Sequence, residues 1–141
     1  TYGYFSTDRE LDRLQARAAQ DKCEYYLFTN GDNLYNKNFL KAVTPAMLQK
    51  TGLIAVNFVS GHFWPQVGAA NVVINARLEH MHVDLGSVLV KANLVGNTRF
   101  LHTDSTTQSS WDADWVFFEQ LLHKPGATST VVPAQVLFYH Q

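Results

Sequence analysis

A single carboxylate, Asp32, stands in the polar segment Asn30-Gly31-Asp32-Asn33, which follows the bulky run YYLFT. Such a segment can end a buried strand and present its carboxylate to a ligand, because ligands collect at the carboxyl ends of strands in open α/β sheets. Carboxylate and amide oxygens suit a hard cation such as Mg²⁺ or Mn²⁺. The alternative is a plain hairpin, for which Asn-Gly is a strong signal. The residues after Asn33 do not repeat the strand pattern before Asn30, which favours the ligand-facing strand end.

Two further carboxylates, Asp112 and Asp114, occur in the segment SSWDADWVFFEQLL. Acidic residues at the start of a helix need no function, because the helix macrodipole favours negative charge there. Trp111 and Trp115 flank these aspartates, however, and indole surface beside a carboxylate can raise its pKa toward that of a general base. Two aspartates in one turn suit one group for catalysis and one for holding a substrate hydroxyl.

Histidines supply the remaining candidates. His80 and His82 lie in HMHVDLGS, where we expect them on one side of a strand. They could share a transition metal there, and paired polar surface residues are the alternative. The turn at residues 84–87 contains Gly86, which would let the backbone approach a ligand, although an ordinary β-turn explains it equally. His140, near the end of the last segment, is typical of a surface histidine when taken alone.

Runs of aromatic and β-branched residues predict the strands that would hold these groups. Pro133 interrupts the last of them, which predicts an edge position or a bulge. A short further strand is predicted in the segment TRFL. The predicted strands cover residues 23–29, 53–59, 87–90 and 129–141.

Capping residues locate the helices. Thr7 and Glu10 form a capping box, and Pro45 suits the first position of a second helix that ends near residue 50. Ser110 or Asp112 caps a third helix that runs to about residue 123. The capping box predicts that the first helix covers residues 8–20. Residues 36–43 give an ambiguous pattern that favours one helical turn. Because strands and helices are intermixed, we expect an α/β fold with a mixed sheet flanked by helices.

Length and charge narrow the function classes. The 141 residues suit one domain, and the net charge of −1 gives no electrostatic case for binding nucleic acid or an anionic membrane. The single cysteine, Cys23, excludes an internal disulfide. Only 16% of residues are charged, so part of the surface is expected to be covered by another segment or chain.

Taken in order, these segments resemble a nucleotide-sugar glycosyltransferase of the A-type fold (GT-A). The resemblance lies in a helix followed by YYLFTNGDN, LIAVNFV, VDLGSVLV, DADWVFFEQLL and a final strand ending in YH. In that family a strand ends in an Asp-x-Asp motif that binds a divalent metal and the diphosphate of the donor. Here the motif would read Asn30-Gly31-Asp32, with Asp32 as the metal ligand and one negative charge fewer. His140 matches a histidine that closes the metal site, and Mn²⁺ or Mg²⁺ is the implied cofactor.

The resemblance also implies roles on the acceptor side. The Glu-Asp acid motif of the family aligns with Ala113-Asp114, which makes Asp114 the general base and Asp112 its neighbour or substitute. The alanine departs from the family pattern. Gly86 and Ser87 match the segment that lines the pocket for the donor sugar and the acceptor.

The implied activity is transfer of a sugar from a nucleotide-diphosphate donor to a carbohydrate or glycoconjugate hydroxyl, with inversion. Residues 1–141 would then be the carboxyl-terminal portion of a catalytic domain, completed by an amino-terminal segment or a companion chain. A non-catalytic fragment or binding domain of the same fold is one alternative, favoured by Asn30 and Ala113. A metal-dependent hydrolase that uses His80, His82 and Asp84 is another. No signal peptide and no apolar run of about 18 residues is visible, which leaves the cytoplasm and the Golgi lumen both open.

Overall fold

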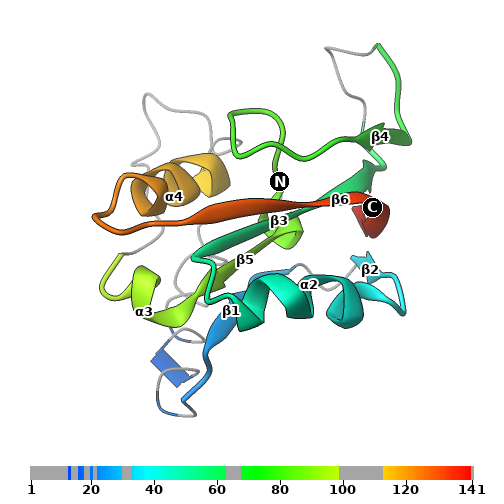
Figure 1. The fold of residues 1–141 in the computed structure, drawn as a ribbon. Coiled ribbons are helices and arrows are strands. Elements are labelled where there is room, and N and C mark those ends of the chain that lie inside the picture. The colour runs from blue at the N-terminus through cyan, green and yellow to red at the C-terminus, as the bar shows by residue number, and fades with distance from the viewer. Residues whose placement is uncertain are drawn as a thin grey trace, which may run out of the picture.

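The computed structural model describes residues 13, 16, 17, 20, 22–29, 33–62, 68–98 and 113–140. In this part of the chain, six strands form one mixed sheet in the order β1-β5-β3-β6-β2, and β4 pairs with the end of β3 (Figure 1). The strands are β1 (Tyr25–Leu27), β2 (Leu34–Tyr35), β3 (Leu53–Ser60), β4 (Val72–Ile74), β5 (Val88–Lys91) and β6 (Ser129–His140). The helical elements are α2 (Phe39–Leu48), the 3₁₀ turn η1 (Leu85–Ser87), α3 (Ala92–Val95) and α4 (Ala113–Leu122).

Strand direction brings several chain segments to one edge of the sheet. β3 and β6 are parallel, and β1 runs the same way because β1 and β3 are both antiparallel to β5. The strands β1, β3 and β6 therefore run toward one edge and end at Leu27, Ser60 and His140, with Leu27 level with Ile54 and thus short of Ser60. The antiparallel strands β2 and β5 begin at that edge, at Leu34 and Val88. We call it the carboxyl edge.

Helices cover both faces of the sheet, as the intermixed strands and helices predicted. The central strand β3 is buried along nearly its whole length, because α4 packs on one side of it and α2 on the other. The cluster on the α4 side contains Leu53, Val88, Val90, Phe117, Phe118 and Leu121. The cluster on the α2 side contains Phe39, Val43, Ile54, Phe58, Leu137 and Phe138. A mixed sheet flanked by helices is thus confirmed at the level of the α/β class.

The predicted strands at residues 23–29, 53–59 and 87–90 are present with small shifts at their ends. The bulge expected at Pro133 is also present. Val56 pairs with Val132, but the next residue, Asn57, pairs with Val136, so the register of β6 shifts across the proline. Because proline has no N–H to donate to a ladder, the bulge removes it from regular pairing.

The prediction that a helix starts at Pro45 is wrong. Helix α2 begins at Phe39 and contains Pro45 in its interior. Pro45 has no N–H to donate to the carbonyl of Lys41. Phe39 and Val43 are buried against the sheet, and their burial stabilises the helix despite this missing hydrogen bond. Thr44 uses its hydroxyl to donate to the Leu40 carbonyl at 2.6 Å, so that carbonyl stays bonded within the helix.

Two further predictions concern the histidines at residues 80 and 82 and the helix at residues 110–123. The prediction that His80 and His82 lie on a strand is wrong. The chain turns at these residues, and Met81 between them has a φ of 66°. The helix at residues 110–123 is confirmed from Ala113 onward. The expected helix at residues 8–20 lies largely outside the described residues, as do the TRFL strand and the cap at 110–112. Within the described residues, no helix is long and apolar enough to cross a membrane.

Candidate functional site

The segment that follows β1 is not the turn of a β-hairpin. β1 and β2 lie at opposite ends of the strand order, and β2 pairs with β6 instead. The strand β1 does run toward the carboxyl edge, as expected for the segment that precedes the Asp-x-Asp-like motif. Asn30, Gly31 and Asp32 themselves lie outside the described residues, so their binding roles stay predictions.

A carboxylate and a histidine meet at the carboxyl edge. The Oδ2 atom of Asp84 lies 3.0 Å from Nδ1 of His140, and the two side chains are 17% and 16% exposed. The Oδ1 atom of Asp84 accepts from the Gly86 N–H at 2.9 Å. The Ser87 hydroxyl accepts from the Asp84 N–H and donates to the Asp84 carbonyl, both at 2.8 Å. This reciprocal cap fixes the carboxylate, and the carboxylate in turn fixes the imidazole ring with Nδ1 toward it.

Gly86 allows the turn of η1 to approach the sheet closely. A Cβ atom at this position would lie 2.6 Å from Cζ of Phe138 and 2.9 Å from the Tyr35 hydroxyl oxygen. The Tyr35 hydroxyl donates to the Gly86 carbonyl at 3.0 Å, and the Tyr35 ring stacks on Phe138 with a centroid distance of 5.1 Å. The sequence suggested that this glycine admits a ligand, whereas the close neighbours in the structure are protein side chains.

The environment of Tyr35 keeps its hydroxyl protonated. Burial raises the pKa of Tyr35, and the negative charge of Asp84 raises the pKa further, against a hydrogen bond from Thr29 that lowers it. A protonated Tyr35 is able to donate to the Gly86 carbonyl at neutral and moderately alkaline pH.

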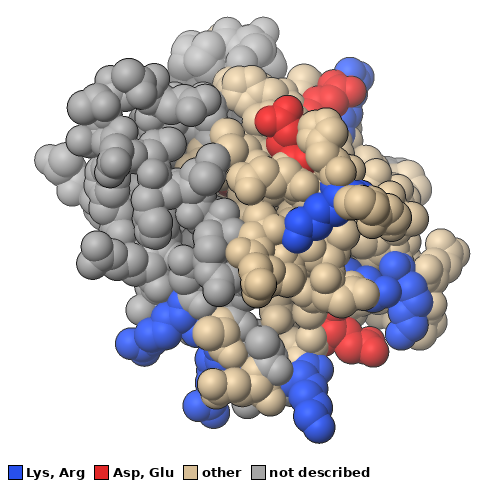
Figure 2. Space-filling view, turned by 90° about the vertical axis from the view of Figure 1, so that its left-hand side faces the viewer, with Lys and Arg blue, Asp and Glu red and all other residues tan. Residues whose placement is uncertain are grey.

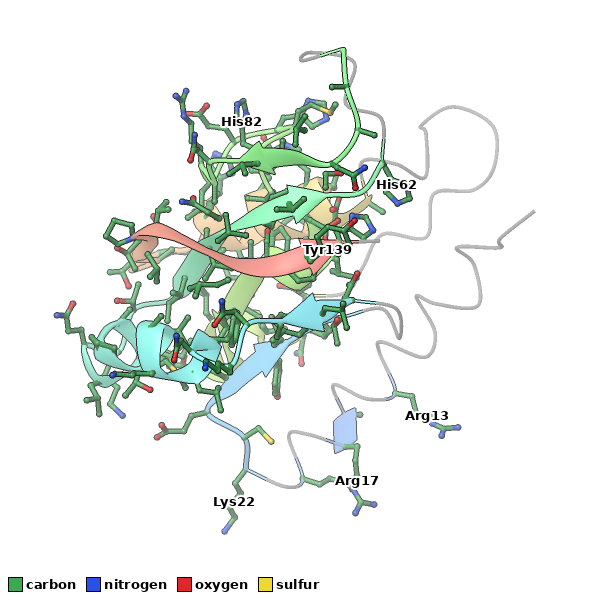
Figure 3. All side chains as sticks on the ribbon, turned by 90° about the vertical axis from the view of Figure 1, so that its right-hand side faces the viewer. Arg13, Arg17, Lys22, His62, His82 and Tyr139 are labelled. Atoms are coloured by element: carbon green, nitrogen blue, oxygen red, sulfur yellow. The ribbon has the colours of Figure 1, made fainter. Side chains whose placement is uncertain are left out.

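A second histidine, His62, borders the pair. Its ring lies edge-on to the His140 ring at a centroid distance of 4.6 Å. Figure 3 labels His62 and Tyr139, the residue before His140. His62 follows the end of β3, and the Gly61 N–H donates to the His140 carbonyl at 2.6 Å, which ties the ends of β3 and β6 together. Sequence reasoning missed His62 and also Ser60, the polar residue that ends the apolar strand β3. A polar residue at the end of a buried run was the available signal.

Asp114 stands apart from this pair. It lies in the first turn of α4, and its Oδ1 atom accepts from the Trp115 N–H at 2.7 Å. Helix α4 packs on the sheet face opposite that of Phe138, on whose ring His140 stacks. Figure 1 shows α4 lying over the part of the sheet near the start of β6, away from the end of that strand. Asp112 lies outside the described residues.

The metal site predicted from His80, His82 and Asp84 is not assembled. The His80 ring lies 6.3 Å from the Trp115 ring, and Nδ1 of His82 is 3.1 Å from the His80 carbonyl oxygen. Asp84 instead faces His140. No cluster of three or more His, Cys, Asp or Glu side chains within the described ranges could hold a metal ion. The arrangement of these three residues therefore gives no support to the hydrolase interpretation.

The charged surface agrees with the small net charge. On the face in Figure 2, the described Lys and Arg side chains are dispersed, and Asp and Glu side chains stand among them. This distribution gives no support to a nucleic-acid partner.

No protein-family model matches the chain, and no curated protein matches it.

Proposed function

We propose that this chain belongs to a metal-dependent, inverting glycosyltransferase with a GT-A fold. In this proposal it moves a sugar from a nucleotide-diphosphate donor to a hydroxyl of a carbohydrate or glycoconjugate. The observation that carries the proposal is the Asp84–His140 pair, which lies at the edge of the sheet toward which β1 also runs. The resemblance of the segments to that family would place the donor at this edge.

The histidine of the pair suits a divalent metal. A histidine that ligates a metal through one ring nitrogen typically holds a carboxylate or carbonyl on the other, which fixes its tautomer and orientation. Asp84 occupies Nδ1 of His140 in this way and directs Nε2 outward from the pair. His140 and Asp32 would hold Mn²⁺ or Mg²⁺, and the metal would neutralise the negative charge of the diphosphate leaving group. Asn30 would contribute a neutral oxygen.

Asp114 is the proposed general base that accepts the proton of the acceptor hydroxyl, with Asp112 as its neighbour. Its place in the first turn of α4 matches the acid motif of the family, which opens a helix. Gly86 and Ser87 would act indirectly, since they hold the turn that positions Asp84. A further segment or a companion chain would supply the site for the nucleotide base.

A binding domain of the same fold without turnover is the second candidate. The Asp114 carboxylate bonds to the N–H of the adjacent Trp115, which is a structural use of an acidic residue at the start of a helix. Ala113 stands where the family has a glutamate, so the acidic pair is reduced to one residue. In this candidate the edge binds a nucleotide sugar, and Asp114 stabilises α4 only.

The melting temperature of the chain with Mn²⁺ and either UDP or GDP tests the donor site. We expect a metal-dependent increase for the wild type, since a ligand that binds only the folded state stabilises it. Asp32→Ala and His140→Gln should abolish the increase, and Glu79→Gln, which alters an exposed carboxylate elsewhere, should retain it. No increase with either nucleotide would contradict a donor site in this chain. If the increase is present, transfer assays on Asp114→Asn decide between enzyme and binding domain.

A further inference from the structure

A second imidazole lies beside the proposed metal ligand at the carboxyl edge. The His62 ring is centred 4.6 Å from the His140 ring, and the two ring planes are inclined at 78°. His62 follows Ser60, the partner of His140 in the register of β3 and β6, by two residues. The Gly61 N–H donates to the His140 carbonyl at 2.6 Å, so the backbone between Ser60 and His62 is fixed to the end of β6. The fold therefore holds the two histidines next to each other.

The two histidines are held in different ways. Nδ1 of His140 lies 3.0 Å from Oδ2 of Asp84, whose other oxygen accepts from the Gly86 N–H at 2.9 Å. A metal at His140 would therefore bind Nε2, the ring nitrogen on the other side. His62 is exposed, so an ion from solvent can reach it and its ring is able to turn about its side-chain torsions. One imidazole is thus oriented in advance, and the second is able to adjust to it.

The distance between the rings suits a shared metal ion. A bond from a metal to an imidazole nitrogen is about 2.0–2.1 Å long, so two imidazoles that share one ion at an angle of about 90–110° have ring centres roughly 4.5–5 Å apart. The separation of 4.6 Å between His62 and His140 falls in this range. An ordinary edge-on contact between two rings also allows this distance, so metal binding is the property that separates the two explanations.

We propose that His62 is a second imidazole ligand of the metal at His140. Asp84 orients His140 and is not itself a ligand, since no cluster of three or more metal-ligating side chains occurs among the described residues. The inference rests on the proposed function for its third ligand, Asp32, which lies outside those residues. The affinity of sites with nitrogen ligands rises from Mn²⁺ to Co²⁺, whereas Mg²⁺ takes oxygen ligands. A site with two imidazoles should therefore bind Co²⁺ most tightly, Mn²⁺ less tightly and Mg²⁺ least.

The first test measures the dissociation constants of Co²⁺, Mn²⁺ and Mg²⁺ by isothermal titration calorimetry, without any nucleotide. His62→Gln should weaken Co²⁺ binding by about 10–100-fold, because even the loss of a group that only orients a metal ligand has an effect of that size. Mg²⁺ binding should change much less, so the preference for Co²⁺ should fall. His123→Gln is the matched control, since His123 is also exposed but follows α4, and it should change neither metal.

The second test uses the paramagnetism of Mn²⁺, which broadens the NMR signals of nuclei close to the ion. A small amount of Mn²⁺ should broaden the ring protons of His62 and His140 together and leave those of His123 sharp. The signals are assigned from the three glutamine variants. Broadening of the His140 signals without those of His62 would overturn the inference.

The outcomes distinguish this inference from the proposed function. Co²⁺ binding that requires His140 but not His62 would overturn the inference and retain the donor site. Co²⁺ binding that requires both histidines, with no increase in melting temperature when UDP or GDP is added with the metal, would support the site with two histidines and refute the donor site. Failure of the wild type to bind Co²⁺ or Mn²⁺, or an affinity for Mg²⁺ equal to that for Co²⁺, would overturn the inference.

Discussion

Replacing Gly86 by alanine should expose how closely the η1 turn is packed against the sheet. The added Cβ would lie 2.6 Å from Cζ and 2.9 Å from Cε2 of Phe138, and 2.9 Å from the hydroxyl oxygen of Tyr35. Phe138 cannot move aside easily, because it is 1% exposed and packed between the rings of Tyr35 and Phe58. The turn must therefore move away from the sheet, and Asp84 moves with it.

The size of the effect follows from the contacts at stake. Overpacking of a tightly filled site typically costs about 1–3 kcal/mol of unfolding free energy. Displacement of the turn would also weaken the hydrogen bond from Tyr35 to the Gly86 carbonyl, worth about 1 kcal/mol. Gly86→Ala should therefore destabilise the fold by about 2–4 kcal/mol. For a chain of this size that corresponds to a decrease in melting temperature of about 6–16 °C.

Urea unfolding of Gly86→Ala in the wild-type and Phe138→Leu backgrounds tests this prediction. Phe138→Leu removes the ring atoms that the new Cβ would meet, so the alanine should cost at least about 1 kcal/mol less in that background. Gly126→Ala is a control, because a Cβ there meets nothing within 4 Å and only the positive φ of 74° is strained. Equal costs of Gly86→Ala in the two backgrounds, or no cost in the wild type, would refute the packing argument.

Three further substitutions test other parts of the fold. Burial raises the pKa of Tyr35 above its ordinary value of 10.0, so above that pH the folded state binds more protons than the unfolded state. The folded state therefore loses stability as the pH rises. Tyr35→Phe should flatten this alkaline decline, as measured by urea unfolding at pH values on either side of 10. Lys124 donates to the last two carbonyls of α3 at 2.7 and 2.8 Å, so Lys124→Met should cost about 1–2 kcal/mol in the same assay, and no loss would mean that this cap is dispensable. Pro45→Ala restores a donor for the Lys41 carbonyl inside α2 and should stabilise the fold by about 1 kcal/mol, with a rise in helical circular dichroism; a destabilised variant would contradict this account of α2.

The sequence was sufficient for elements whose burial follows from local pattern. The run at residues 53–59 is apolar except for Asn57, and it became the central strand because both of its faces are covered. Capping signals were less reliable. Pro45 suggested a helix start, but the burial of Phe39 and Val43 against the sheet extended the helix past it.

The candidate site was harder to predict because its contacts join distant segments. Asp84 and His140 were each identified as candidates, but their pairing depends on how β5 and β6 are placed around β3. The sequence around Asp84 gives no indication that it pairs with His140, and the sequence around His140 gives none of Asp84. The candidate site of Asp84 with His80 and His82 rested on proximity along the chain, whereas Asp84 pairs in the structure with His140.

Asp84 connects the stability of the fold to the geometry of the candidate site. One of its carboxylate oxygens accepts from the Gly86 N–H and holds the turn, while the other faces His140. Any change that displaces the turn must therefore also release the imidazole ring. Substitution of Gly86 should reduce stability and ligand binding together, although no atom of Gly86 is proposed to touch the ligand.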